Sequence, residues 1–286
     1  MNILVTGANG QLGTELGIIL EKSKLADNLF LASHDDLDIT NFTAVRDFTI
    51  KHHIDTIINC AAYTAVDDAE DNYIKAKQIN CIGPQNLAST GCKIIHPSTD
   101  YVFSGQKKQP YKPTDETNPS TIYGYTKLMG EQAVTKNAKE YVIIRTSWVF
   151  SPYGKNFVKT MRKLGATKKN IDIVSDQIGT PTYAKDLASA IVEIIPQMNP
   201  NNRGIYHFSN MGQCSWYDFA CEIMKLSELK CKVYPIPTHA YPTKALRPKY
   251  SVLDTTKIRD IFGIEPAPWQ DALQRCIHKI KEIERQ

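Results

Sequence analysis

The stretch VTGANGQLG, residues 5–13, decides the fold class that this sequence predicts. It follows a short apolar run and precedes a stretch of helical period, so it is interpreted as the turn between a first strand and a first helix. Three glycines stand in it at G-x-x-G-x-x-G spacing: Gly7, Gly10 and Gly13. The first permits a tight turn, the second lets backbone N–H groups approach a diphosphate, and the third lets the helix lie close to the sheet. The motif therefore predicts a dinucleotide-binding turn at the start of a β-α-β unit.

Strand-like and helix-like segments alternate outward from this turn over the first 150 residues. Short β-branched runs lie at 3–5, 29–32, 56–58, 93–95 and 141–144, and stretches of helical period lie at 14–21, 41–52 and 74–89. Strands that are apolar on both faces and separated by helix-length segments are typical of a parallel sheet covered on both sides. The first half is therefore predicted to be a Rossmann-type doubly wound α/β domain.

The second half loses this regular alternation. The segments expected there are a helix at 182–195, a strand at 204–209, a helix at 216–225, a strand at 233–236, a proline-rich loop to 248 and a last helix from 268. We interpret the later segments as a smaller mixed α/β C-terminal domain that binds substrate. The predicted division gives residues 1–150 and about 171–208 to the dinucleotide-binding domain, and about 151–170 and 209–286 to the substrate-binding domain.

Composition narrows the class of protein. The chain has 34 Lys and Arg against 30 Asp and Glu, a formal net charge of +4, which is far from the concentrated basicity of a nucleic-acid binder. Seven cysteines are scattered without a C-x-x-C pair, so neither a disulfide framework nor a zinc site is indicated. The N-terminus does not resemble a secretory signal, and the sequence has no long apolar run. We expect a soluble, cytoplasmic protein without a nucleic-acid or membrane partner.

The end of the second strand usually selects between the nicotinamide cofactors. A carboxylate there accepts hydrogen bonds from the ribose hydroxyl of NAD and repels the 2′-phosphate of NADP. Here the strand LFLA (29–32) is followed by Ser33 and His34, and Asp35 and Asp36 come only afterwards. Because no carboxylate stands at the expected place, the sequence favours NADPH, or use of both NADPH and NADH.

Two tyrosines and a lysine in TIYGYTKLMGE (121–131) raise the question of which tyrosine does chemistry. If this stretch opens a helix, Tyr123 and Lys127 stand at i and i+4 and share a face, whereas Tyr125 points elsewhere. The phenol has a pKa near ~10, and a nearby ammonium would favour its phenolate. Thr99 ends the strand of KIIHPSTDYVF (93–103), at the edge where open α/β sheets bind ligands. We therefore expect Tyr123 to protonate a carbonyl held by Thr99, beside a nicotinamide that supplies hydride.

With these motifs on hand, the chain resembles the extended short-chain dehydrogenase/reductases and, within them, the dTDP-4-dehydrorhamnose reductases. The resemblance covers nearly the whole sequence. Its motifs are VTGANGQLG (5–13), LDIT (37–40), NCAAYTAVDDAE (59–70), STDYVF (98–103), YGYTKLMGE (123–131), RTSWVF (145–150), NFVKTM (156–161), DQIGTPTY (176–183) and ALRPKYSVL (245–253).

The resemblance implies reduction of the C4 keto group of dTDP-4-dehydro-L-rhamnose, in L-rhamnose and polysaccharide biosynthesis. It implies catalytic roles for Tyr123 as proton donor, Lys127 on the nicotinamide ribose and Thr99 on the substrate oxygen. Motifs and resemblance together predict a cofactor site of Gly7, Gly10, Gln11, Leu12, Gly13, Ser33, Asp38, Ile39, Ala62, Tyr63, Thr64, Tyr123 and Lys127. The predicted substrate contacts are Thr99, Asp100, Tyr123, Trp148, Asn156 and Arg247. The Arg247 guanidinium is suited to a diphosphate.

Three alternatives stay open at this point. A nucleotide-sugar 4,6-dehydratase would have Thr-Asp-Glu after the strand, but Tyr101 stands where that glutamate is needed, so elimination lacks its base. An epimerase can use the same Thr, Tyr and Lys, and a non-catalytic reductase-like subunit could bind the cofactor and regulate a partner enzyme. Consumption of NADPH with a 4-keto nucleotide sugar separates these alternatives from the reductase.

A metal and an oligomer are weaker expectations. The sequence has no His, Cys and Asp cluster at ligand spacing. Glu15 resembles a position involved in a magnesium-bridged dimer in some relatives, but we interpret it as a solvated glutamate in the first turn of a helix. The expected assembly is a monomer or a homodimer.

Overall fold

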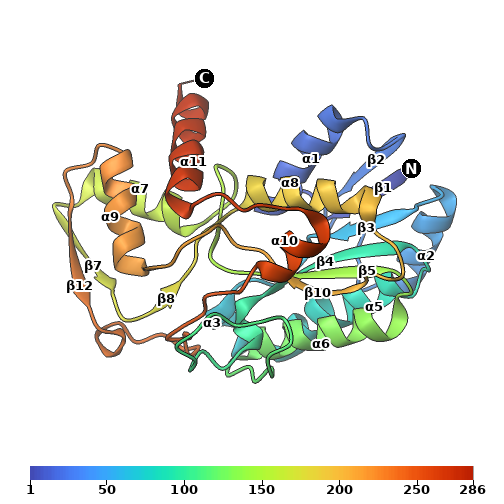
Figure 1. Ribbon diagram of the computed structural model, residues 1–286, viewed down its shortest axis with the longest axis horizontal. Helices are drawn as coiled ribbons and strands as arrows, with labels where there is room; N and C mark the ends of the chain where they lie inside the picture. The colour runs from blue at the N-terminus through green and yellow to red at the C-terminus, as the bar shows by residue number, and fades with distance from the viewer. Residues whose placement is uncertain (286) are drawn as a thin grey trace.

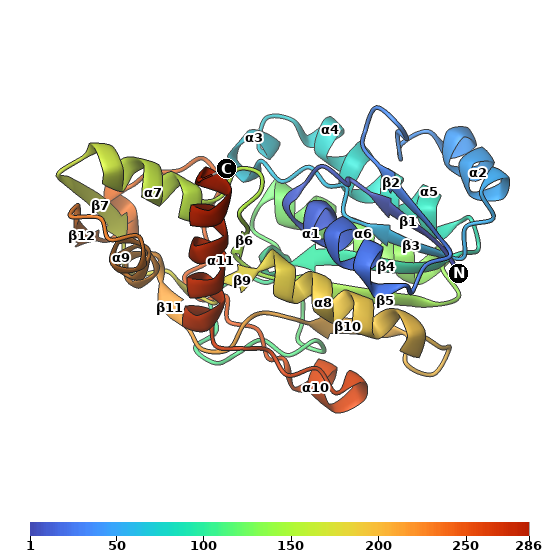
Figure 2. The same ribbon diagram turned by 90° about the horizontal axis from the view of Figure 1, so that it is seen from above.

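The computed structural model describes residues 1–285, and a six-stranded sheet lies at its centre (Figures 1 and 2). Its strands are β1 (Asn2–Thr6), β2 (Asn28–Ala32), β3 (Thr56–Asn59), β4 (Lys93–Thr99), β5 (Tyr141–Thr146) and β10 (Gly204–His207). They stand in the order β10-β5-β4-β3-β1-β2, and every neighbouring pair is parallel. The direction of winding reverses at β1, between β2 and β3, and such a reversal is the usual ligand site of an open α/β sheet.

Helices cover both faces of this sheet. On one face lie α1 (Gln11–Ser23), α8 (Ala184–Ile194) and α10 (Thr256–Phe262); on the other lie α2 (Phe42–Lys51), α5 (Gly83–Ala88) and α6 (Ile122–Asn137). Because helices bury both faces, residues such as Ile3, Leu4 and Val5 of β1 are fully buried on alternate sides. The predicted Rossmann-type fold class is confirmed.

The predicted helix at 74–89 has a wider turn in its middle. It consists of α4 (Tyr73–Lys77), a π-helical turn η1 (Gln78–Ile82) and α5, and the short α3 (Val66–Ala69) precedes it. Such π-turns are rare and often lie at functional sites. This one brings a buried asparagine, Asn80, to the edge of the candidate site.

A second body lies beyond the carboxyl edge of the sheet, at the left of Figure 1. It is built from α7 (Phe157–Thr167), β7 (Asn170–Val174), α9 (Trp216–Leu226), β12 (Lys232–Ile236) and α11 (Trp269–Glu284). Its own core includes Phe219, Trp269 and Ile277. Short elements lie at and beyond the junction of the two bodies: η2 (Asp100–Val102), β6 (Val149–Phe150), β8 (Ile178–Gly179), β9 (Thr182–Tyr183), β11 (Cys214–Ser215) and η4 (Thr238–Ala240). The short η3 (Ile195–Gln197) continues α8 in the first body.

Two segments pack differently from the predicted division of the chain. β7, which falls in the range 171–208 assigned to the first domain, pairs in parallel with β12 of the second body. α10, assigned to the second domain, packs Ile258 and Phe262 into the core of the first. The predicted second domain runs to residue 286, and Gln286 itself lies outside the described residues.

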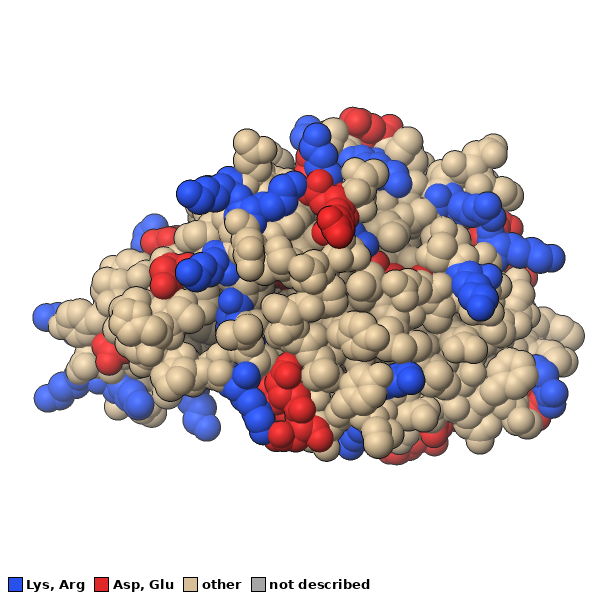
Figure 3. Space-filling view, turned by 90° about the horizontal axis from the view of Figure 1, so that it is seen from below, with Lys and Arg blue, Asp and Glu red and all other residues tan. Residues whose placement is uncertain are grey.

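The length of the helices and the surface charge bear on whether a membrane or a nucleic acid could be a partner. Among residues 1–285, no helix is both long enough and apolar enough to span a membrane. On the face seen in Figure 3, Lys and Arg side chains are interspersed with Asp and Glu, and much of the face is uncharged.

Candidate active site

The glycine turn leaves space that a side chain would fill. Gly7 has φ +64°, and a Cβ on it would stand 2.6 Å from the backbone N of Ala61. A Cβ on Gly13 would stand 2.4 Å from the carbonyl oxygen of Gly7. Gly10 precedes α1 and supplies no side-chain cap, so the first N–H groups of the helix face a bare backbone cradle. This cradle fits the diphosphate of a dinucleotide at a helix N-terminus.

The turn after β2 brings the Asp36 carboxylate close to the strand end. The Asp36 carboxylate accepts hydrogen bonds from the backbone N–H (2.9 Å) and the hydroxyl (2.6 Å) of Ser33. These two bonds lower the pKa of Asp36, so the group stays anionic at neutral pH. As the sequence predicts, Ser33 and not a carboxylate directly follows β2, but the turn folds the Asp36 carboxylate back onto Ser33.

The loop after β3, which holds the predicted contacts Ala62, Tyr63 and Thr64, is fixed by Asn80. The Asn80 side chain accepts from the Tyr63 N–H (2.8 Å), and its amide donates to the Tyr63 carbonyl (3.1 Å) and to the Thr126 hydroxyl (3.1 Å). Sequence reasoning missed Asn80. The available signal was a polar residue on the buried side of a helical stretch, but the π-turn that aims it could not be read from periodicity.

The predicted Thr99 and Tyr123 meet at the carboxyl end of β4. Tyr123 packs edge-on against Tyr101, with ring centroids 5.5 Å apart, and its phenol lies within hydrogen-bond reach of Thr99. Tyr125 is 47% exposed and points away from the sheet. Burial raises the pKa of Tyr123 to about 12, although the Thr99 hydroxyl lowers it. The preference for Tyr123 over Tyr125 thus agrees with the geometry.

Lys127 lies beside this pair, but its ammonium is turned toward the sheet. Its Nζ donates to the Pro97 carbonyl (2.8 Å), and the side chain is buried. Burial lowers the pKa of Lys127 to about 8, against Glu131 and Cys60, which raise it. Burial and the Asp100 carboxylate raise the pKa of the Tyr123 phenol, and the Thr99 hydroxyl lowers it. An effect of the Lys127 ammonium on the Tyr123 phenol stays a prediction.

A cavity of about 940 Å³ lies mainly in the second body, with Asp67 of α3 at its border with the first. Arg247 lines it, pairs with Asp67 of α3 and lies near the Tyr101 phenol, whose pKa its charge lowers against the effect of burial. The aromatic wall includes Trp216, against which Trp148 stacks at a centroid distance of 3.5 Å. An apolar wall with a fixed guanidinium is suited to a nucleotide diphosphate.

Comparison with known proteins agrees with this geometry. The family model described as "RmlD substrate binding domain" matches residues 1–282. A dTDP-4-dehydrorhamnose reductase of Aggregatibacter actinomycetemcomitans is 42% identical, over 95% of this chain and 97% of its own length. The chain belongs to the dTDP-4-dehydrorhamnose reductase family.

Solved structures of dTDP-4-dehydrorhamnose reductases superpose over nearly the whole chain. One from Clostridium acetobutylicum has a TM-score of 0.94 at 44% identity and covers 98% of this chain and 100% of that chain. One from Bacillus anthracis, in complex with NADP, has a TM-score of 0.92 at 39% identity and covers 97% of this chain and 99% of that chain. The two bodies of this member of the dTDP-4-dehydrorhamnose reductase family are thus arranged as in these structures.

Two of the predicted substrate contacts, Asn156 and Asp100, interact with other side chains of the protein. The Asn156 amide donates to the Gln11 side chain (2.9 Å) and to the Ser151 carbonyl (2.7 Å), and its oxygen caps α7. Burial raises the pKa of Asp100 to about 6, against the hydroxyls of Ser251 and Thr99, which lower it. Contacts of either residue with substrate stay a prediction.

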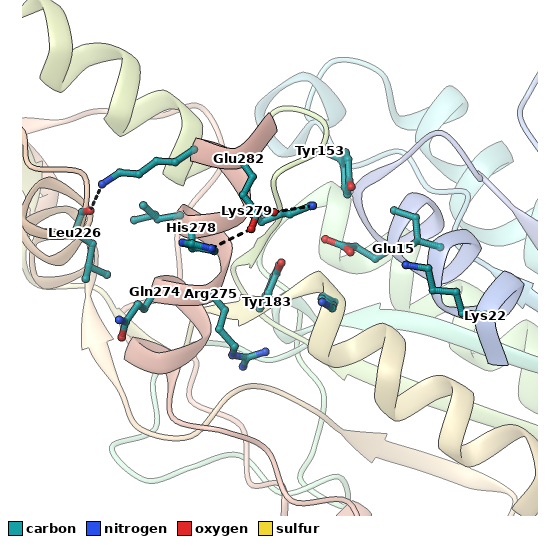
Figure 4. Close-up of a pocket in the computed structure, with 14 residues that line it drawn as sticks. Glu15, Lys22, Tyr153, Tyr183, Leu226, Gln274, Arg275, His278, Lys279 and Glu282 are labelled. Carbon is teal, nitrogen blue, oxygen red and sulfur yellow. Dashed lines mark hydrogen bonds and ion pairs between the residues drawn. The ribbon is translucent and has the colours of Figure 1, made fainter. Parts of the chain in front are cut away.

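Glu15 faces a second cavity, of about 710 Å³, between α1, α8 and α11 (Figure 4). It is buried and accepts a hydrogen bond from Ser151 (2.9 Å), and burial raises its pKa. The interpretation of Glu15 as a solvated glutamate was therefore wrong. Basic side chains, including Lys22 and Lys185, also line this cavity. Within residues 1–285, no group of three or more His, Cys, Asp or Glu side chains is arranged to hold a metal ion.

Proposed function

We propose that this protein reduces the C4 keto group of dTDP-4-dehydro-L-rhamnose to give dTDP-L-rhamnose, with NADPH or NADH as the hydride source. The observation that supports the reaction most directly is the position of Thr99 and Tyr123. Thr99 ends β4, and Tyr123 lies beside it in the first turn of α6; Arg247, which lines the cavity, lies near the adjacent Tyr101. The carbonyl of a substrate anchored in that cavity would meet two hydroxyls at the edge of the sheet.

The protonation state of Tyr123 suits a proton donor. A phenol with a pKa of about 12 keeps its proton at neutral pH. A reduced nicotinamide, when bound, would supply the hydride for the carbonyl carbon. The carbonyl oxygen would then develop alkoxide character, which is more basic than a phenolate. Tyr123 can then give up its proton while the Thr99 hydroxyl holds the same oxygen.

The environment of Tyr101 disfavours a dehydratase. Burial raises the pKa of the Tyr101 phenol, so this group stays protonated and cannot serve as the base for elimination. An epimerase stays chemically compatible with the three residues, but it returns its hydride and consumes no net cofactor.

A direct assay tests the reaction. The protein is mixed with NADPH and dTDP-4-dehydro-L-rhamnose, and the absorbance of NADPH and the sugar product are followed. We expect stoichiometric oxidation of NADPH and formation of dTDP-L-rhamnose. Interconversion of nucleotide sugars without net NADPH oxidation would favour an epimerase, and binding of NADPH without turnover of any 4-keto sugar would favour a regulatory subunit. A matched panel of dTDP and UDP sugars tests the base preference.

Asp36 gives a prediction on cofactor preference. We expect kcat/KM with NADPH to be at least as high as with NADH, and Asp36→Asn to raise kcat/KM for NADPH by about fivefold, because an anion near the 2′-phosphate is removed. NADH kinetics should change little. The measurement is kcat/KM for both cofactors. Asp35→Asn, one residue away, serves as the control. A strong wild-type preference for NADH, or equal changes for both cofactors, would contradict the assignment.

Arg247 gives a prediction on substrate affinity. Arg247→Ala should raise KM for the nucleotide sugar by about tenfold or more and leave kcat nearly unchanged, because a bond to a distant diphosphate contributes equally to ground and transition states. Lys244→Ala is the control: this cation belongs to the same loop and pairs with Asp71, but it is half exposed and screened by water. Equal effects of both variants on KM would show that general charge, and not Arg247, attracts the substrate.

The proposed function also leads to a proposed location in the cell. A nucleotide-sugar reductase works where NADPH and sugar nucleotides are available, which fits the cytoplasm. We propose a monomer or a homodimer.

A further inference from the structure

A buried ion pair lies directly behind the Tyr-x-x-x-Lys face of α6. Glu131 of α6 and Arg145 of β5 form a two-bonded fork, with Arg145 Nε 2.9 Å from Glu131 Oε1 and Nη2 2.7 Å from Oε2. The Ser98 hydroxyl donates to the same Oε1 at 2.6 Å. The side chains of Arg145 and Glu131 are only 3% and 2% exposed. Water therefore hardly screens this pair.

Ser98, Glu131 and Arg145 lie close to the proposed catalytic residues in the fold. Ser98 immediately precedes Thr99 on β4, and it lies opposite Arg145 in the parallel register of β4 and β5. Glu131 is one helical turn beyond Lys127 on α6, on the same face. One cluster thus ties the helix that holds Tyr123 and Lys127 to the strand that ends in Thr99.

A buried ion pair is a poor way to gain stability alone, because desolvation of both charges offsets most of their attraction. Apolar residues of similar volume would hold the helix as well. A charged fork differs in two respects: it fixes the rotation and height of α6 within narrow limits, and it places a carboxylate near Lys127.

Of the titratable groups around the Lys127 ammonium, Glu131 is the one that carries a negative charge and raises the pKa of Lys127. Cys60 after β3 faces the ammonium, and burial keeps this thiol neutral by raising its pKa to about 12. His96 of β4 is also buried, and its pKa is well below its usual range, so it is neutral. Arg145 adds a positive charge from β5, which Glu131 neutralises.

We propose that Glu131 and Arg145 are positioning residues, which set the height of Tyr123 against Thr99 and keep Lys127 protonated for the nicotinamide ribose. The claim about the position of Tyr123 rests on the proposed function. The claim that Glu131 keeps Lys127 protonated depends only on the binding of NADPH.

The test is Glu131→Gln, which keeps the shape of the side chain and removes its charge. Lys127 loses a favourable neighbour, so its pKa falls. A protonated Lys127 is present below that pKa and lost above it, so NADPH affinity should weaken at a lower pH than in the wild type, by about one unit. The Kd of NADPH, measured by fluorescence at pH values from 6 to 10 in steps of about half a unit, reports this shift without any substrate. With substrate, kcat should fall about tenfold.

Val134→Ala is the matched control, because Val134 is fully buried on the same helix and carries no charge. It should lower the free energy of unfolding without moving the pH dependence of NADPH binding. The charge role is overturned if Glu131→Gln leaves this pH dependence in place.

Ser98→Ala provides a second variant if Glu131→Gln does not fold. It removes one hydrogen bond to Glu131 and keeps both charges, so we expect kcat to fall about threefold and the pH dependence to stay. An unchanged kcat would overturn the positioning role. Failure of the wild type to reduce any 4-keto sugar would instead refute the proposed function, and the NADPH titration would still test the charge role.

Discussion

Tyr123→Phe is expected to lower kcat by ~10²-fold or more, while Tyr125→Phe leaves kcat within about twofold of the wild type. The phenol of Tyr123 is buried beside Thr99 and holds a proton at neutral pH, whereas Tyr125 is exposed. The measurement is steady-state NADPH oxidation with dTDP-4-dehydro-L-rhamnose. KM for both substrates should change little, because the lost hydrogen bond acts mainly on the developing alkoxide.

The substitution isolates the hydroxyl. Phenylalanine keeps the edge-on contact with Tyr101, so the packing of α6 is preserved. Thermal unfolding should therefore show similar midpoints for both variants and the wild type. Comparable losses of kcat in the two variants would mean that neither hydroxyl is the proton donor, and that the helix as a whole had been disturbed.

Much of the first body could be predicted because its signals are local. Strands such as β1 and β3 are mostly apolar runs, and the glycine turn between a strand and a helix marks a helix N-terminus that can bind a diphosphate. The i,i+4 spacing likewise separated Tyr123 from Tyr125, since it depends only on helix geometry.

The remaining features depend on contacts between distant segments. β7 follows α7 closely in sequence, but its partner β12 comes about sixty residues later, and no local pattern names that partner. α10 is a short helix whose apolar residues fit either core. The fork between Glu131 and Arg145 was also missed, because two charged residues in separate elements give no sign that they are buried together.

The direction of the Lys127 side chain could not be predicted for a related reason. Helical spacing places two residues on one face, but the direction of a long side chain depends on what surrounds it. In this structure the Lys127 ammonium donates a hydrogen bond to the Pro97 carbonyl. Burial raises the pKa of the phenol, and the Thr99 hydroxyl lowers it.

Gly7→Ala is expected to weaken NADPH binding by about tenfold or more and to lower the free energy of unfolding by about 2–4 kcal/mol. Two effects add. An alanine at φ +64° adopts the left-handed region at a cost of about 1–2 kcal/mol. Its Cβ would also overlap the backbone of Ala61, which must move together with the loop that continues to Tyr63.

Gly263→Ala separates these two effects. Gly263 ends α10 at φ +69°, nearly the same backbone conformation, but a Cβ there meets nothing within 4 Å. We expect this variant to lose only the conformational part, about 1 kcal/mol, and to bind NADPH as the wild type does. Denaturant unfolding and NADPH fluorescence titration measure both quantities. If Gly7→Ala and Gly263→Ala lose the same free energy of unfolding and both keep the wild-type affinity for NADPH, the prediction is wrong. The close contact between Gly7 and the loop after β3 would then not be needed for cofactor binding. A selective loss of NADPH affinity in Gly7→Ala would instead mean that the bare backbone at the start of α1 is what the diphosphate requires.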